Sequence, residues 1–251
     1  MRQAVHAEWT KVRTLPGLLW LLAAVAVLTA AVSAATVAAV HCPATGCAQD
    51  PARLSLTGVQ FGQAGVAVLA VLLISGEYAT GMIRTTVTAM PRRTTVLGAK
   101  ALVLAGLVLV AGTVAVLGSV LAGRLVLPGH GFGFSPAHGP VLRAAAGSVA
   151  YLVLVALLSL GVATAVRDSA AAIGVVLGLL YLFPILASVV SDPGWYRHLQ
   201  QIGPMTAGLA VQTTIPSSSA VIGPYRGLAV LAAWSAAALL TALALFRTRD
   251  T

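Results

Sequence analysis

Six long apolar stretches constrain the fold of this chain more than any other feature. A bilayer core is about 30 Å thick, and a helix needs about 20 apolar residues to cross it. Since backbone polar groups must be satisfied within the segment in lipid, each stretch is expected to be a helix. The ten-residue alternation of a transmembrane barrel is absent from the sequence. The sequence therefore predicts an all-α integral membrane protein with six transmembrane helices, at roughly 17–40, 59–77, 96–123, 141–166, 169–190 and 226–246.

Composition agrees with this prediction and excludes other classes. The chain has 251 residues, of which 59% are hydrophobic and only 8% charged, whereas soluble globular proteins carry about 25% charged residues. The net charge of +9 comes from basic residues between the apolar runs, without the clustered base-reading groups that would predict a nucleic-acid partner. No His or Cys spacing typical of a metal site is present. We expect a single transmembrane domain over residues 1–251 that binds neither nucleic acid nor metal.

The basic residues also predict the orientation in the membrane. Cytoplasmic loops carry an excess of Lys and Arg. The set of segments that includes both chain ends holds ten Lys and Arg residues, and the alternating set holds five. Both termini are therefore expected in the cytoplasm, in a bacterial cytoplasmic membrane. The first apolar run exceeds the 7–15 residues of a signal-peptide core, so we interpret it as a span.

Two cysteines, Cys42 and Cys47, lie in the segment HCPATGC on the predicted outer face. Oxidising conditions outside the cell favour a Cys42–Cys47 disulfide. A ring this short would mainly stiffen the loop locally. Two free thiols are the alternative.

The residues before the first span, 1–16, have the pattern of an interfacial helix lying on membrane lipid. Val5, Trp9 and Val12 share one helical face, and most charged residues lie elsewhere. A plain basic flank that only sets the topology is the alternative. Together with two arginines before the third span, this segment supplies the expected inner-surface anchors, which are Trp9, Lys11, Arg13, Arg92 and Arg93.

The stretch EYATGMIRTTVTAMPRR, residues 77–93, gathers charge between the second and third spans. A glycine and a proline bound a piece that is long enough for two helical turns. Ile83, Val87 and Met90 are spaced i, i+4 and i+7, which predicts one apolar stripe. An apolar face without its own core needs lipid or a partner protein, and the spacing does not decide between them.

This stretch resembles the segment E-Y-x-x-G-x-I-R-x-T-x-x-x-x-P-R-R of ABC-2-type permeases, the six-span membrane subunits of ATP-binding-cassette exporters. The start AEWTKVRTLPG and the end ALFRTRDT are also similar to that family, so the resemblance covers nearly the whole chain. It implies a coupling helix that docks on a cytosolic ATPase dimer. The docking residues that it implies are Met82, Ile83, Arg84, Val87 and Met90.

The resemblance also implies the other partners. The chain would pair with a second copy of itself or with a sister permease. It contains no Gly-Lys-Ser/Thr motif, so a phosphate-binding loop must be on a separate polypeptide. We therefore expect no enzymatic activity and no bound cofactor in this chain, with ATP and Mg²⁺ on the partner ATPase. Two re-entrant helices, near 194–202 and 205–215, are expected in the last external loop; an ordinary loop is the alternative.

Polar residues within the spans are few. Gln60, Phe61 and Gln63, near the outer end of the second span, are candidates for the substrate path. Polar side chains in spans also serve helix packing, which is the alternative for them. The surroundings are apolar, so a drug, a peptide or a lipid-like molecule is the expected substrate. The glycine pairs Gly58/Gly62 and Gly174/Gly178 would permit close helix packing across a dimer.

Three other functions predict different sequence features. An ion-coupled secondary transporter would normally carry an ionisable residue at mid-membrane, but all six acidic residues lie at span ends or beyond. A membrane-embedded enzyme would need a motif such as HExxH or GxSxG, and the sequence has neither. A membrane scaffold or immunity protein without transport is compatible with the composition.

Overall fold

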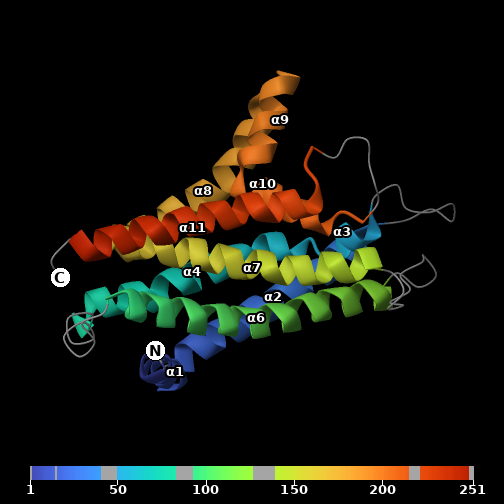
Figure 1. Cartoon of the computed structure of the whole chain (residues 1–251). Coiled ribbons are helices and arrows are strands. Elements are labelled where there is room, and N and C mark those ends of the chain that lie inside the picture. The colour runs from blue at the N-terminus through green and yellow to red at the C-terminus, as the bar shows by residue number, and fades with distance from the viewer. Residues whose placement is uncertain are drawn as a thin grey trace.

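The computed structural model describes residues 2–14, 16–40, 50–82, 93–126, 139–214 and 221–248. These ranges consist mostly of helix and contain no strand. Six of their helices are long and apolar enough to cross a membrane, and they form an elongated bundle (Figure 1). The prediction of an all-α protein with six such helices is confirmed. They are α2 (Pro16–Ala39), α4 (Gly58–Ala79), α6 (Arg93–Val126), α7 (Gly139–Val166), α8 (Ser169–Val189) and α11 (Pro224–Thr248).

The two ends of the bundle carry different parts of the chain. The start of α1 (Arg2–Thr14) and the end of α11 lie at the same end, and α3 (Pro51–Ser55) lies at the other (Figure 1). We name these the inner end and the outer end, following the orientation that the basic residues predict. This arrangement is what an even number of crossings requires.

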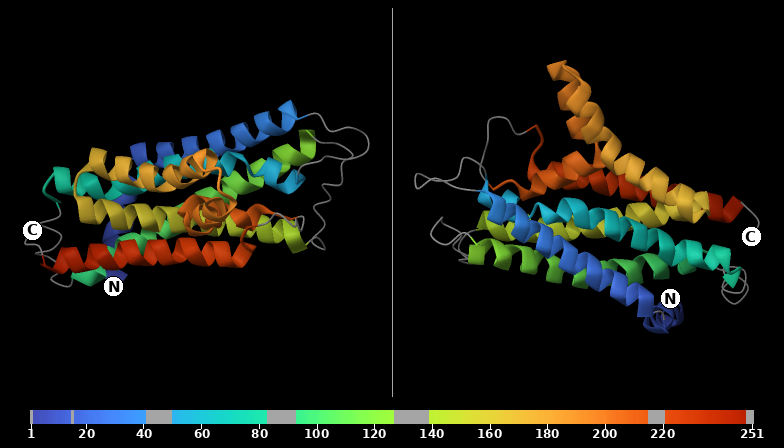
Figure 2. Two further views of the ribbon diagram at one scale, coloured as in Figure 1. Left: turned by 90° about the horizontal axis from the view of Figure 1, so that it is seen from above. Right: turned by 180° about the vertical axis from the view of Figure 1, so that it is seen from behind.

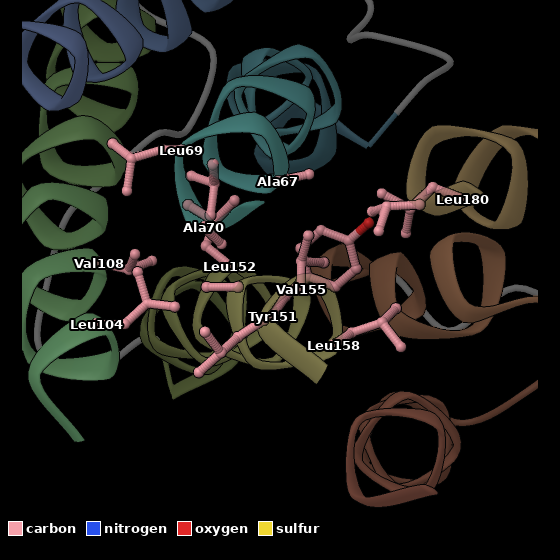
Figure 3. Close-up of a cluster of buried hydrophobic side chains, with 14 of the residues drawn as sticks. Ala67, Leu69, Ala70, Leu104, Val108, Tyr151, Leu152, Val155, Leu158 and Leu180 are labelled. Atoms are coloured by element: carbon pink, nitrogen blue, oxygen red, sulfur yellow. The ribbon is translucent and has the colours of Figure 1, made fainter. Parts of the chain in front are cut away.

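Helix α7 forms the centre of the bundle because it packs against α4, α6, α8 and α11. Its side chains Tyr151, Leu152 and Val155 are at most 2% exposed and lie between residues of α4, α6 and α8 (Figure 3). At Gly161 a Cβ would come within 2.7 Å of the backbone of Ala238 in α11, so the helices meet there at backbone distance. Small residues allow such close approach between membrane helices.

Two glycines bring α4 against α2. A Cβ at Gly58 would lie 1.9 Å from the carbonyl oxygen of Thr29, and one at Gly62 would lie 2.2 Å from Thr29 Oγ1. The Gly58 amide donates a hydrogen bond to Ser33 Oγ at 3.0 Å. Gly58 and Gly62 therefore pack within one chain, and not across a dimer as expected from their spacing. A Cβ added at Gly174 or Gly178 in α8 would meet no described atom within 4 Å.

Helix α1 lies across the direction of the bundle at its inner end, since Figure 1 shows it nearly end-on while the spans run across the view. Its buried residues are Ala4, Glu8 and Val12, and it packs mainly against α6. Trp9 is 45% exposed on another face. The face toward the bundle thus includes a charged residue, which the apolar pattern of the segment did not predict.

The outer end carries two short helices between α8 and α11. They are α9 (Pro193–Ile202) and α10 (Pro204–Leu209), which meet at Gly203 and are followed by a 3-10 turn η1 (Ala210–Gln212). The outer part of α8 projects from the bundle together with α9, whose last residues contact α11 (Figures 1 and 2). Helix α10 packs against α11. Asp192 caps α9, because its carboxylate accepts hydrogen bonds from the amides of Gly194 and Trp195 at 2.8 and 2.9 Å.

Candidate functional site

Four charged side chains meet at the inner end, and we call them the ionic cluster: Glu8, Lys11, Glu77 and Lys100. Lys100 Nζ donates to Glu77 Oε1 at 2.6 Å and to Glu8 Oε2 at 2.7 Å. Lys11 Nζ donates to Glu77 Oε1 and to Glu8 Oε1, both at 2.8 Å. Each lysine thus bridges both carboxylates. The cluster joins α1, the last turns of α4 and the first turns of α6.

The cluster is largely removed from solvent. Lys100 is 1% exposed, Glu8 5% and Glu77 6%, while the Lys11 side chain is 30% exposed. Buried charges are costly unless they are paired and hydrogen-bonded. Two ammonium groups and two carboxylates balance here, so each buried charge has an opposite charge in direct contact. The Glu77 Oε2 atom has no hydrogen-bond partner among the described residues.

The electrostatics of α1 follow from these contacts. Burial alone would raise the pKa of Glu8, but the adjacent charges and hydrogen bonds of Lys100 and Lys11 hold the pKa below its ordinary value. Burial would likewise lower the pKa of Lys11, and the hydrogen bonds and charges of Glu77 and Glu8 instead raise that pKa. Both groups are therefore held in their charged forms at neutral pH.

The ionic cluster brackets the segment between α4 and α6. Glu77 comes shortly before this segment and Lys100 shortly after it. Gly81, at φ +70°, turns the chain away from the end of α4, and Met82 beyond it is 43% exposed. The sequence-predicted residues Ile83, Arg84, Val87, Met90 and Arg92 lie outside the described residues.

A second contact holds the neighbouring inner turn. Arg167 lies between α7 and α8 in a left-handed conformation with φ 66°. Its guanidinium carbon lies 5.6 Å from the centroid of the Tyr78 ring, which is a cation–π distance. Asp168 then caps α8 by accepting a hydrogen bond from the Ala171 amide at 2.7 Å. The end of α4 is thus tied to α1 and α6 through Glu77 and to the α7–α8 turn through Tyr78.

The inner-surface anchors fall into different surroundings. Trp9 and Arg13 are exposed, but Lys11 belongs to the ionic cluster and bridges two carboxylates. Arg93 begins α6, and its side chain lies outside the described residues. Glu8, Glu77 and Lys100 were absent from the predicted site.

A signal for the cluster was present in the sequence. An acidic residue at the C-terminal end of a helix is disfavoured by the helix dipole, so Glu77 at that position indicates a cationic partner. Lys100 lies two turns inside α6, which is deep for a side chain that only anchors at the headgroups.

The three candidate path residues also separate in the structure. Gln60 lines a cavity of about 510 Å³ at the outer end. Phe61 is 55% exposed on the surface of α4. Gln63 is fully buried; its Nε2 donates to Met205 Sδ at 3.1 Å, and its Oε1 accepts a hydrogen bond from Tyr151 OH. Gln63 therefore serves packing between α4, α7 and α10 in this structure.

The described ranges bear on metal binding but not on the predicted Cys42–Cys47 disulfide. No three His, Cys, Asp or Glu side chains come together there in an arrangement that could hold a metal ion. Cys42 and Cys47 lie outside the described residues.

The fold defines a multi-pass helical membrane protein, and its inner end presents an ion-paired junction of three helices. A family model described as ABC-2 family transporter protein matches residues 4–185, which include all four residues of the ionic cluster. The chain belongs to this family, and it is therefore the membrane permease component of an ABC transporter. Members are membrane transport components that are generally not catalytic themselves, and they associate in general with an ABC ATPase. A comparison with curated proteins found no match.

Proposed function

We propose that this chain is the permease subunit of an ATP-driven exporter that moves a lipophilic substrate by alternating access. Two cytosolic ATPase subunits would supply the energy, and they would hold ATP and Mg²⁺. The observation that carries the proposal is the ionic cluster, which joins the helices that precede and follow segment 83–92 in a chain of the ABC-2 family.

The connection between α4 and α6 matters for the transmission of force from an ATPase to the spans. A segment that docks on a moving ATPase can move the spans only if its two ends are firmly attached to them. Glu77 and Lys100 attach the end of α4 to the start of α6 through a 2.6 Å ion pair. Glu8 and Lys11 add α1 to the same junction. Displacement of the segment would therefore carry three helices together.

The apolar stripe predicted at Ile83, Val87 and Met90 would provide the docking face, with Arg84 as an electrostatic contact to the ATPase. In this orientation the inner end faces the cytoplasm of a bacterial cell. A lipid-facing role for the stripe is the competing interpretation, and a test at Val87 separates the two.

Pairing with a second permease would place the substrate path between two subunits. Gly174 and Gly178 support an approach along α8, because a Cβ at either position would meet no described atom of the same chain within 4 Å. The partner is a second copy of this chain or a sister permease.

Co-purification with an ABC ATPase from the same organism tests the docking assignment. Val87→Asp places a charge on the predicted stripe and should abolish recovery of the complex. Thr85→Asp is the matched control, because helical spacing places residue 85 opposite the stripe, and this variant should retain the ATPase. Equal recovery of both variants would show that the stripe does not dock.

A further inference from the structure

The outer cavity lies where the end of α8 departs from the bundle. Pro184 lies inside α8, whose outer part projects from the bundle with α9 packed against it (Figure 2). Pro184, Tyr196 and Gln200 line one side of the cavity. Arg53, Gln60 and the α10–η1 segment line the other side. At about 510 Å³ the cavity is within the range of small-molecule sites, about 300–1,000 Å³.

Four polar side chains converge on this cavity without using their hydrogen-bonding groups internally. They come from α3, α4 and α9, and none of them makes a side-chain hydrogen bond to another described residue: Arg53, Gln60, Tyr196 and Gln200. The two lining threonines differ, since the hydroxyls of Thr206 and Thr213 donate to backbone carbonyls. The cavity therefore presents unused donors to whatever occupies it.

The charge of the lining has one sign. Among the described residues that line the cavity, Arg53 alone is charged, and none of them is a carboxylate. A guanidinium offers a planar fork of donors that matches a carboxylate, sulfate or phosphate group. The remaining lining is apolar and suits a hydrocarbon body: Pro184, Met205, Leu209, Ala210, Val221 and Ile222.

Hydrogen bonds hold the walls in place. On the bundle side, Tyr181 OH donates to the Gln60 carbonyl at 2.9 Å, and Arg143 Nη2 donates to the Thr213 carbonyl at 2.7 Å. On the other side, Trp234 Nε1 donates to the Ile202 carbonyl at 3.0 Å and fixes the end of α9. The cavity is thus largely pre-formed, which lowers the cost of ordering a bound molecule.

We propose that this cavity binds an amphipathic anion, with its head group on Arg53 and its apolar body against α10, η1 and Pro184. If the bound anion is the transported substrate, the proposal rests on the proposed exporter function. Binding of the anion does not depend on that function, because the cavity is formed within one permease chain. The shared chemistry fits a free amphiphile and an anionic lipid alike.

Binding of a defined probe to the purified permease tests this proposal. The chain is placed in phosphatidylcholine nanodiscs and titrated with dansyl-undecanoic acid, with empty discs subtracted. Arg53→Gln should weaken binding roughly tenfold, because it removes one charge-assisted hydrogen-bonded contact. Arg197→Gln is the matched control, an exposed α9 arginine outside the lining, and it should bind like the natural chain. The uncharged dansyl-undecanol should bind Arg53→Gln and the natural chain with equal affinity.

Two further arms complete the test. Ile222→Trp places bulk in the apolar part and should weaken both probes. Phosphatidylglycerol in the discs should compete with the probe if an anionic lipid is the natural occupant, and should leave its affinity unchanged if the occupant is a free amphiphile. Equal affinity of Arg53→Gln and Arg197→Gln for the anionic probe would overturn the proposal. No ATPase is present, so failure of the docking assignment would not affect this result.

Discussion

Lys100 Nζ lies 2.6 Å from Glu77 Oε1, and this ion pair joins the helices on either side of segment 83–92. The two residues are at most 6% exposed, so solvent does little to screen their interaction. Because Glu8 and Lys11 complete the same cluster, the end of α4, the start of α6 and helix α1 form one junction.

The two lysines of the cluster should differ in their contribution to stability. Lys100→Met would leave two buried carboxylates with one cation, which should lower the free energy of unfolding by about 3–5 kcal/mol. Lys11→Met leaves the same two carboxylates with one cation, but Lys11 is 30% exposed, so water can reach the position it vacates and replace part of its contacts. Its loss should therefore cost less, about 1 kcal/mol. Unfolding of both variants in the same detergent measures the difference. Equal costs would contradict the burial argument.

The contribution of Glu8 should depend on pH. Its folded pKa is below the unfolded value of about 4.3, so its stabilisation is present above that pH and is lost as pH falls through the lower folded pKa. The stability difference between the natural chain and Glu8→Gln should therefore be constant from about pH 8 to pH 5 and shrink below that. Lys11 has a raised pKa, so its contribution is lost only in alkali, as pH rises through the folded pKa. Thermal unfolding of both proteins at each pH measures this difference in stability. A difference that increases as the pH is lowered would contradict the lowered pKa of Glu8.

Glycines on α4 and α8 should respond differently to alanine. Gly58→Ala puts a Cβ at 1.9 Å from a backbone oxygen of α2, so the helices must separate, at a cost of about 1–3 kcal/mol. Gly174→Ala meets no described atom within 4 Å and should be neutral for the folding of one chain or stabilise it by up to about 1 kcal/mol. Unfolding in detergent measures both effects. A destabilised Gly174→Ala together with an unaffected Gly58→Ala would contradict the packing described here.

The spans could be predicted because each depends on local properties, namely length and hydropathy. The observed helices begin and end within about three residues of the expected stretches, for example Pro16–Ala39 against 17–40 and Ser169–Val189 against 169–190. The division of the outer segment at Gly203 was also predictable, because a glycine followed by a proline interrupts a helix.

The ionic cluster and the packing of Gln63 could not be predicted in the same way. Residues 8, 77 and 100 meet only after three helices have packed, and apolar periodicity carries no information about which charges will pair. The pattern of segment 1–16 favoured a face around Trp9, whereas the structure buries the face of Ala4, Glu8 and Val12. Gln63 looked available to a substrate because its partners, Tyr151 and Met205, are distant in the sequence. In both cases tertiary contacts decided the role of the side chain.

ATP turnover by the reconstituted complex tests the central claim most directly. The chain and the ATPase that co-purifies with it are placed in liposomes, and hydrolysis is compared for the natural permease, Val87→Asp and Thr85→Asp. The coupling account predicts that Val87→Asp reduces turnover to the level of the ATPase alone, while Thr85→Asp retains the natural rate. Natural turnover with Val87→Asp would contradict the account, because segment 83–92 would then not be the contact through which this permease engages its ATPase.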